Sequence, residues 1–335
     1  MCPSHLKRIH LATIRARTGH EVVAHPIIEH LRNGKFRIIQ RTVPGDAPKD
    51  FLQIYEHGVA HRAAIAAWPK YIAKVGHKWY PNESITEHLL TRIGQLLGLT
   101  IADSRLMFVR GQLRFLSCYF LKKDQSLVHG AEIFAGHLAD EAFVREVEQQ
   151  KMSRDVFTFQ VVEEAIGSRF PAEAEVILDG FVRMLAFDAI VGNNDRHYFN
   201  WGVITDLKGR RSPRFAPIYD TARALFWDGP EAKLAEVDRN KRREAFVQKY
   251  VDECMPKTGW DGKTGLNHFA LIQTIAKERP RFAPVLSGLC TTNLPERVDQ
   301  LMGTEFAGLF SHRRHEFVLE CLNLRVQRYV QAVHT

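Results

Sequence analysis

The chain has 335 residues, of which 45% are hydrophobic and 25% are charged. This composition is typical of a folded protein and excludes a largely disordered, collagen-like or coiled-coil chain. Lys and Arg exceed Asp and Glu by 46 to 38, which gives a net charge of +8. Such an excess favours anionic partners such as nucleotide phosphates, nucleic acids or acidic proteins. The sequence has no zinc-finger spacing or RNP-like aromatic motif, so no direct nucleic-acid site is evident.

Five cysteines are scattered along the sequence without a C-x-x-C pair. This pattern supports neither a disulfide framework nor a paired-cysteine zinc site, and it indicates a reducing cytoplasm. No apolar run approaches the roughly 18 to 20 residues that a bilayer span needs, and the first ten residues lack the apolar core of a signal peptide. We therefore expect a cytoplasmic protein without a membrane span; secretion as an effector stays open.

The beginning of the chain predicts a small antiparallel sheet. Its short segments are rich in β-branched and aromatic residues and are separated by turn residues, which is typical of strands. These segments are 19–25, 35–41, 50–55, 61–67 and 70–75. The last two are predicted to pair around a Trp-Pro turn.

Residues 84–98 predict the first helix, because their apolar residues recur at helical spacing. Two further strands are expected at 105–110 and 113–121, joined as a hairpin by a Gly-Gln turn. The pattern then changes to helices, which are expected at 138–151, 156–166, 172–191, 266–278, 294–302 and 312–333.

This change in pattern predicts a two-lobed α+β fold. Residues 1–122 are expected to form a lobe of a small antiparallel sheet plus one helix. Residues 123–335 are expected to form a larger, mainly helical lobe, with a short connector between the two.

The most informative stretch is 181–225. An apolar helix is expected to end at Gly192, and the polar loop N-N-D-R-H-Y-F-N and two short strands, W-G-V-I-T-D and R-F-A-P-I-Y-D, follow it. Asp195, Asn200 and Asp220 thus emerge from the ends of buried elements. In phosphoryl transfer a carboxylate orients the attacking hydroxyl, while an amide and a second carboxylate hold Mg²⁺ on the nucleotide phosphates. The five-residue spacing from Asp to Asn equals that of the protein-kinase pattern H-R-D-x-x-x-x-N.

The pair N-N-D-R-H-Y-F-N-W-G and A-P-I-Y-D-T resembles the catalytic signature of HipA-type serine/threonine kinases. This family is a bacterial branch of the protein-kinase-like fold that includes toxin kinases and short translocated relatives. Upstream, K-Y-I-A-K-V places Lys74 on a strand, and T-E-H-L-L-T-R-I-G-Q-L-L-G-L places Glu87 near the start of the next helix. The resemblance covers residues 55–225, and the short segment before Lys74 favours the toxin-core or effector-like forms.

The resemblance implies a role for each matching residue. Asp195 acts as the base or orienter of the substrate hydroxyl, and Asn200 and Asp220 ligate Mg²⁺. Lys74 neutralises the α- and β-phosphates of ATP and is held in place by Glu87.

The resemblance also implies where the nucleotide lies. The hinge between the lobes is formed by Tyr119, Phe120 and Leu121, and the adenine lies beside it. The loop that covers the phosphates is expected at 56–62, where Gly58 is the only glycine. Because 56–62 contains no Ser or Thr, the family's inactivation by autophosphorylation of this loop is not expected here.

By resemblance, the reaction is transfer of the γ-phosphoryl group of ATP to a Ser or Thr of a protein substrate. Some family members act on aminoacyl-tRNA synthetases, so the resemblance implies a translation factor or such a synthetase as substrate, and many members are held in check by a small DNA-binding antitoxin. Two alternatives stay open at this point. One is a small-molecule or lipid kinase on the same fold, and the other is a catalytically silent nucleotide-binding scaffold, suggested by the glycine-poor loop.

Three residues have local alternatives. Glu87 lies three residues after Ser84 and could complete a capping box at the helix start. Arg196 could form an ion pair inside the helical lobe or contact a substrate phosphate. His197 is expected to brace the loop by hydrogen bonds rather than to act as a base.

Overall fold

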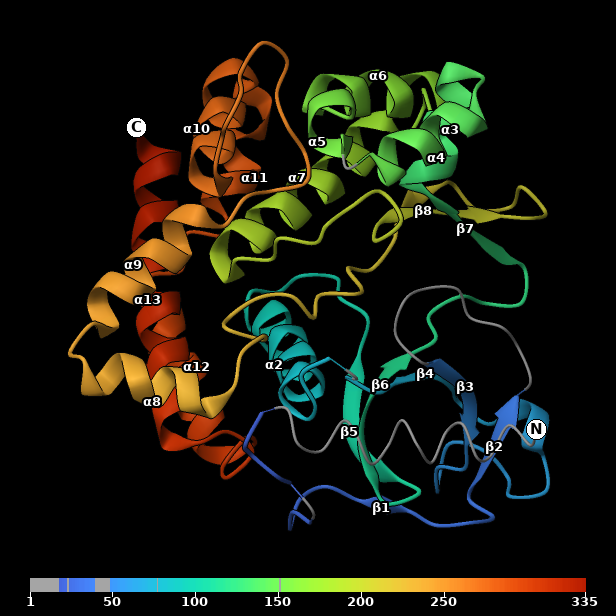
Figure 1. Ribbon diagram of the computed structural model, residues 1–335. Coiled ribbons are helices and arrows are strands. Elements are labelled where there is room, and N and C mark those ends of the chain that lie inside the picture. Colours follow the sequence, from blue (N-terminus) through green and yellow to red (C-terminus); the bar gives the residue numbers. More distant parts are fainter. Residues whose placement is uncertain (1–17, 23, 40–48, 77, 151) are drawn as a thin grey trace.

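The computed structural model describes residues 18–22, 24–39, 49–76, 78–150 and 152–335. Two lobes are visible in Figure 1, one built on a curved sheet and one built mainly of helices. The elements of the first lobe are β1 (His30–Leu31), β2 (Phe36–Ile39), β3 (Lys49–Ile54), the 3₁₀ helix η1 (Ile65–Ala67), β4 (Lys70–Lys74), α2 (Asn82–Leu96), β5 (Ser104–Val109) and β6 (Gln112–Cys118).

The six strands of this lobe form one sheet in the order β1-β5-β6-β4-β3-β2. Only β1 pairs in parallel, and the other neighbours are antiparallel. The β5–β6 hairpin turns through Arg110 and Gly111, both with positive φ (53° and 74°). Two such residues make the turn whose twist matches that of paired strands. The expected hairpin is therefore confirmed, but its turn is Arg110-Gly111 instead of the expected Gly-Gln, because Gln112 already belongs to β6.

Both faces of the sheet are apolar. On one face α2 packs against β5 and β6 and contributes the fully buried Ile85, Leu89 and Ile93. The other face holds a separate small cluster that includes Leu52 and Leu116. Packing on both faces fixes the register of the strands, because a slip of one residue would exchange the two faces.

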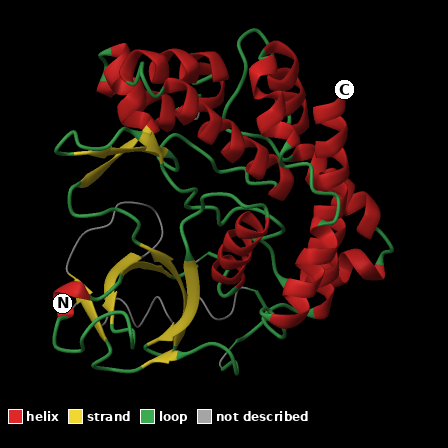
Figure 2. Cartoon of the chain, turned by 180° about the vertical axis from the view of Figure 1, so that it is seen from behind, coloured by secondary structure: helices red, strands yellow, loops and turns green. Residues whose placement is uncertain are grey.

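The second lobe begins with a three-stranded sheet in the order β7-β8-β9. Figure 2 shows this lobe from behind, with its helices gathered on the side away from the six-stranded sheet. Its elements are β7 (Gln125–His129), α3 (Gly130–Leu138), α4 (Glu141–Gln149), α5 (Ser153–Val156), α6 (Phe159–Arg169), α7 (Ala174–Val191), β8 (Gly202–Asp206), β9 (Arg214–Phe215), α8 (Glu231–Arg239), α9 (Arg243–Glu253), α10 (His268–Glu278), η2 (Pro280–Phe282), α11 (Ala283–Ser287), α12 (Leu294–Thr304) and α13 (His312–His334).

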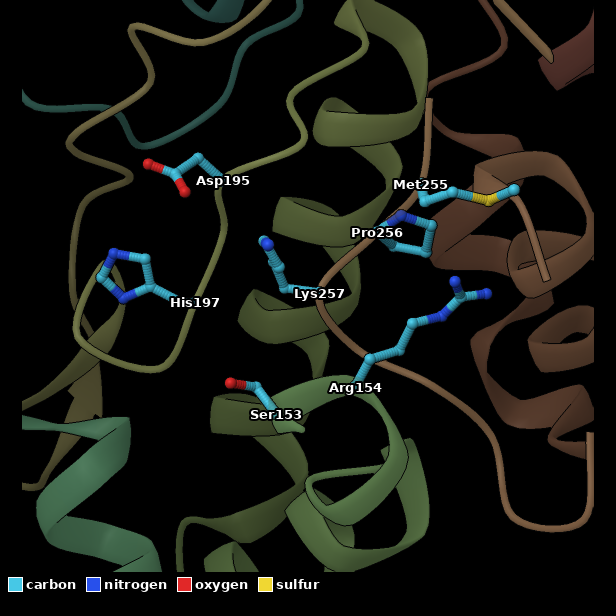
Figure 3. Close-up of a pocket in the computed structure, with 7 residues that line it drawn as sticks. All are labelled: Ser153, Arg154, Asp195, His197, Met255, Pro256 and Lys257. Atoms are coloured by element: carbon cyan, nitrogen blue, oxygen red, sulfur yellow. The ribbon is translucent and has the colours of Figure 1, made fainter. Parts of the chain in front are cut away.

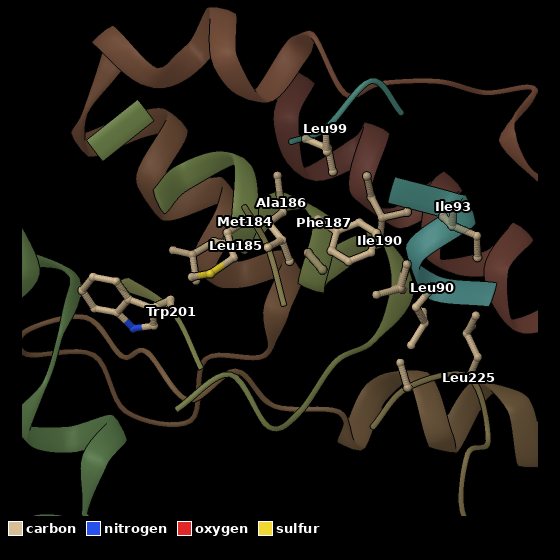
Figure 4. Close-up of a cluster of buried hydrophobic side chains, with 14 of the residues drawn as sticks. Leu90, Ile93, Leu99, Met184, Leu185, Ala186, Phe187, Ile190, Trp201 and Leu225 are labelled. Carbon is tan, nitrogen blue, oxygen red and sulfur yellow. The ribbon is translucent and has the colours of Figure 1, made fainter. Parts of the chain in front are cut away.

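The central helix of this lobe is α7, which contacts α6, α10, α11, α13 and β9. Its apolar residues continue into the first lobe, since the main hydrophobic cluster contains Leu90 and Ile93 of α2 together with Phe187 and Ile190 of α7. Figure 4 shows these side chains and Leu225 in one cluster. The apolar core is therefore continuous between the lobes, and it includes both α2 and the helix that precedes the loop at 193–200.

The expected architecture, a sheet lobe followed by a helical lobe, is confirmed. Two expected strands are not formed. Residues 61–67 contain a turn and η1, in keeping with the low strand preference of their alanines. The described residues of 19–25 form no strand. None of the helices in the described part of the chain is both long and apolar enough to cross a membrane.

The expected helices of the second lobe are formed with shifted ends, whereas α8, α9 and α11 lie outside every range that was expected to be helical. The segment 138–151 is divided between α3 and α4, because Ala139 adopts the left-handed conformation and ends α3. The strand expected over 214–220 is formed only at β9, and Ile218 adds an isolated bridge to Ile101 of the first lobe.

Candidate active site

The loop after α7 is positioned by the end of that helix. Gly192 ends α7 with a φ of 78°, and its N–H donates to the Asp188 carbonyl. Asn193 then folds back, and its amide donates to Asp188 Oδ1 at 2.9 Å. The Asn193 carbonyl accepts a hydrogen bond from His268 Nε2 of α10 at 3.0 Å. The start of the loop is thus tied to two helices before the chain reaches Asp195.

Arg196 stabilises this loop from within. Its side chain is buried, and its guanidinium forms a two-pronged ion pair with Asp188 at 2.9 and 3.0 Å. It also donates to the carbonyls of Asn200 and Tyr219. Arg196 therefore makes the ion pair inside the helical lobe, which decides between the two alternatives for this residue. It also joins the two expected metal-binding segments, since Tyr219 precedes Asp220.

Asp195 and Asn200 lie together, as their spacing predicts. The side-chain amide of Asn200 donates to the Asp195 carbonyl at 2.9 Å, so the remaining amide oxygen is the available ligand atom. Asp195 Oδ2 lies 3.1 Å from Arg223 Nη1. Burial raises the pKa of Asp195, although Arg223 and, to a smaller extent, His197 and Lys257 oppose this. A carboxylate with a raised pKa is better suited to accept a proton near neutral pH.

Asp220 meets Lys74 across the two lobes. The Lys74 ammonium lies 3.0 Å from Asp220 Oδ1 and 2.6 Å from Glu87 Oε1. A second lysine, Lys49 of β3, lies 3.5 Å from Asp220 Oδ2. Asp220 has a φ of 56°, a conformation that Asp tolerates better than most residues. The expected ligands of ATP and Mg²⁺ from both lobes are therefore brought together.

The charges of this group fit its geometry. Burial disfavours the charge on Lys74, but Asp220 and Glu87 outweigh this effect and raise the Lys74 pKa. Burial would raise the pKa of Asp220, yet Lys74 and Lys49 together lower it well below the ordinary value. Burial raises the pKa of Glu87 to about 7, although Lys74 opposes this. Lys74 and Asp220 are therefore both charged at neutral pH.

Glu87 is buried and contacts Lys74 directly. The capping-box alternative with Ser84 is not formed, because the helix begins at Asn82 and the Ser84 hydroxyl accepts from the Gly76 N–H. Glu87 thus lies in the second turn of α2, where its carboxylate faces β4.

Tyr119, Phe120 and Leu121 lie in the segment that joins β6 to β7. The Tyr119 N–H donates to the Lys70 carbonyl of β4 at 2.9 Å. The Phe120 ring lies 5.8 Å from the ring of Tyr219, the residue before Asp220. The structure therefore places these three residues at the junction of the lobes.

Gly58 is not brought to this group, and its expected position in the phosphate loop is corrected. In the β3–β4 pair, Lys49 lies opposite Lys74, and Gln53 lies opposite Lys70. The segment 56–62 joins the other ends of these strands, so β4 separates it from Lys74. The strand ends near Lys74 are those between β2 and β3, and residues 40–48, which join them, lie outside the described residues.

The donor set at Asp220 and Asn200 fits Mg²⁺, a hard cation that prefers carboxylate and amide oxygens together with phosphate oxygens. The Asp220 carboxylate is ionised, and its side chain is 31% exposed. The two segments are held in register by Arg196. No group of three or more His, Cys, Asp or Glu residues in the described ranges could hold a metal ion by protein ligands alone. Two protein oxygens leave the other coordination positions of Mg²⁺ to water and phosphate oxygens.

Several residues that contact the candidate site do not belong to any sequence motif. Lys49 and Arg223 pair with Asp220 and Asp195 across the fold, and only their closeness to predicted elements could have indicated them. Two arginines of α13 are also missing from the sequence prediction. Arg325 is buried and donates to the Ala189 carbonyl of α7 at 3.0 Å. Arg314 donates to the Gly229 carbonyl at 2.9 Å and holds the segment that follows Asp220.

Comparison with solved structures supports this fold. The Helicobacter pylori proinflammatory kinase CtkA aligns over 92% of this chain and 97% of its own, with a TM-score of 0.68 and 15% identity. The HipA chain of the Shewanella oneidensis HipA, HipB and operator DNA complex aligns over 79% of this chain and 59% of its own, with a TM-score of 0.47 and 17% identity. The likeness to CtkA shows that this chain has the two-lobed kinase fold.

Comparison with known sequences identifies the family. The Sinorhizobium fredii protein Y4dM, named as a candidate kinase, is 31% identical over 67 residues. The match spans 20% of this chain and 16% of Y4dM. The sequence model described as "HipA-like C-terminal domain" matches residues 42–279, a range that contains every member of the Lys74, Glu87, Asp195, Asn200 and Asp220 group. The chain therefore belongs to the family of proteins with a HipA-like C-terminal domain.

Proposed function

We propose that this protein is an ATP- and Mg²⁺-dependent protein serine/threonine kinase. The observation that carries the proposal is the meeting of Lys74 with both Glu87 and Asp220, beside a loop that presents Asp195 and Asn200. This arrangement supplies the phosphate-binding lysine with its glutamate, the two metal ligands and the carboxylate that orients the acceptor hydroxyl in kinase phosphoryl transfer.

The Lys74 ammonium contacts the α- and β-phosphates of ATP, and Glu87 fixes its direction. Lys49 adds a second cation beside the Asp220 carboxylate. Asp220 and the amide oxygen of Asn200 would hold Mg²⁺, which when bound neutralises charge on the phosphates. Tyr119, Phe120 and Leu121 lie at the lobe junction and line the place for the adenine.

Asp195 accepts the hydrogen bond of the acceptor hydroxyl and aims its oxygen at the γ-phosphoryl group. As the bond from oxygen to phosphorus forms and the bond to the β-phosphate oxygen breaks, the hydroxyl proton passes to the Asp195 carboxylate. Rate acceleration comes mainly from positioning and from fixed charges, because the protein supplies no covalent intermediate. Arg196 has no contact with the reacting groups in this scheme and keeps the loop in shape.

The test is transfer of ³²P from γ-labelled ATP to a mixed Ser and Thr protein substrate, with and without Mg²⁺. We expect Mg²⁺-dependent labelling by the native protein, and its loss in Asp195→Asn and Asp220→Asn. Faster labelling of metabolites or lipids than of any protein would favour the small-molecule kinase instead. Stabilisation by ATP without turnover would favour the silent scaffold.

The glycine-poor loop no longer supports the scaffold alternative, because 56–62 lies at the far ends of β3 and β4 from Lys74. A protein substrate such as a translation factor or aminoacyl-tRNA synthetase, and a small DNA-binding antitoxin, stay predictions from the family resemblance. Co-purification of a short DNA-binding protein with the native chain from its own host tests the antitoxin.

A further inference from the structure

A pocket of about 210 Å³ lies beside Asp195, and Lys74 is not part of its lining. Its lining comes from three separate segments, namely the loop of Asp195 and His197, the start of α5, and the connection from α9 to α10. The lining residues are Ser153, Arg154, Asp195, His197, Met255, Pro256 and Lys257. Figure 3 shows the Lys257 side chain directed toward the space between Asp195 and His197.

The segment that contains Lys257 is held in place by contacts with neighbouring elements. A Cβ on Gly259 would lie 2.2 Å from the Arg154 carbonyl oxygen, so only glycine allows this close approach of the two segments. The Gly259 carbonyl accepts from the Phe159 N–H at 3.0 Å. At the other end of the segment, the Cys254 thiol donates to the Gly192 carbonyl at 3.2 Å. The backbone on both sides of Lys257 is therefore fixed against the end of α7 and the start of α6.

The charges of the pocket are not balanced within it. Asp195 is the only acidic residue of its lining, and its carboxylate is paired with Arg223. The Arg154 guanidinium donates to the Leu266 carbonyl and extends away from Asp195 (Figure 3). Lys257 is exposed and makes no ion pair with a carboxylate of the described residues. A cation thus faces the place of the acceptor hydroxyl. Its charge acts on Asp195, but within the described residues no ion pair holds it away from an anion of the substrate.

We propose that this pocket selects an acceptor peptide that carries an anionic side chain beside its Ser or Thr, with Lys257 as the residue that recognises it. The inference rests on the proposed kinase function and names the substrate class of the same site. When the acceptor hydroxyl reaches Asp195, the neighbouring side chain of the peptide meets the Lys257 ammonium. Aspartate, glutamate and phosphoserine share the required chemistry, whereas a lysine or arginine at this position is repelled.

The experiment compares serine peptides of one backbone sequence in which the residues flanking the serine are Asp, phosphoserine, Ala or Lys. The native protein is expected to show a kcat/KM about tenfold higher for the Asp peptide than for the Lys peptide. Lys257→Ala should reduce this ratio to near one, and Lys257→Glu should reverse it. The Asp and phosphoserine peptides distinguish an acidic from a previously phosphorylated substrate.

The matched control is Lys208→Glu, which makes the same change of charge on the exposed turn between β8 and β9, outside the pocket. It should keep the native ratio. The pocket assignment would be overturned, and the kinase function left intact, if the native protein used the Asp and Lys peptides equally well. The same conclusion would follow if Lys257→Glu left the native ratio of kcat/KM unchanged. An equal loss for all peptides in Lys257→Ala would assign Lys257 to the phosphoryl group and also overturn it. If neither the peptides nor any protein were phosphorylated, the proposed function itself would be overturned.

Discussion

Lys74 of the sheet lobe lies 3.0 Å from Asp220 of the helical lobe, and this ion pair joins the two halves of the candidate site. Asp220 holds its position with a φ of 56°. A residue in this conformation has both a chemical and a backbone role, and two substitutions can separate these roles.

Asp220→Asn and Asp220→Ala are both expected to lower phosphoryl transfer by at least about 100-fold, because each removes the carboxylate. They should differ in stability. Asn tolerates the left-handed conformation, whereas Ala in it costs about 1 kcal/mol more. Urea unfolding of the two variants, beside ³²P transfer, measures both effects. Full transfer by Asp220→Asn would remove Asp220 from the metal site.

Arg223→Ala is expected to move the acidic limb of the pH–rate profile to higher pH. Burial raises the pKa of Asp195, and Arg223 is the foremost charge that opposes the rise. Without this cation the protonated form of Asp195 persists to higher pH, so the carboxylate that accepts the hydroxyl proton is lost earlier as the pH falls. Arg223→Lys keeps the charge and should retain a profile near that of the native protein. A shift to lower pH in Arg223→Ala would contradict this account of Asp195.

Arg196→Met is expected to destabilise the protein by about 3–5 kcal/mol, because it leaves the Asp188 carboxylate buried without its partner. Both side chains are about 2% exposed. The double variant Asp188→Leu with Arg196→Met removes both charges and should recover much of the loss. Chemical denaturation followed by circular dichroism completes this double-mutant cycle. If the double variant lost the sum of the two single effects, Arg196 would not act through Asp188.

His268 predicts a specific pH dependence of stability. Burial, with help from Arg325, lowers the His268 pKa to about 3, and its Nε2 donates to the Asn193 carbonyl. The folded protein keeps this ring neutral, whereas the unfolded chain binds a proton below about pH 6.5. His268 therefore contributes a loss of stability as the pH falls, about 1.4 kcal/mol between about pH 7.5 and 5.5.

The control for His268 is His268→Gln, which cannot take up a proton in either state. Its free energy of unfolding should fall less steeply than that of the native protein over the same pH range. Parallel curves for the two proteins would show that this ring does not titrate on unfolding.

The sequence predicts the site better than it predicts the local structure around it. The sequence could identify Asp195, Asn200 and Asp220 because the first two lie five residues apart in one loop. The third lies at the end of a short segment that follows that loop. Lys74 and Glu87 could be found because a short strand and a strongly periodic helix follow each other directly. The site also contains side chains from other segments, namely Lys49, Arg223 and Lys257. No local sequence pattern predicts that a lysine contacts a residue of another lobe, or that Gly259 allows the segment of Lys257 to approach Arg154 closely.

The errors in the fold have similar causes. The segment 61–67 is mostly apolar and precedes a Trp-Pro pair, which resembles a strand and turn, but it forms a turn and η1. The misplaced phosphate loop followed from that error. With a strand expected at 61–67, the nearest connection to Lys74 was 56–62, whereas the observed β3–β4 pairing places Lys49 opposite Lys74.

The last helix gives the family match an additional meaning. The HipA-like segment ends at residue 279, and α13 begins at His312. A fragment cut at the end of that segment would keep every proposed catalytic side chain and lose both Arg314 and Arg325, which hold the segment after Asp220 and the end of α7. The unit recognised in sequence is therefore shorter than the unit that folds. Relatives recognised by that segment alone need equivalent anchors from elsewhere before their motifs imply an ordered site.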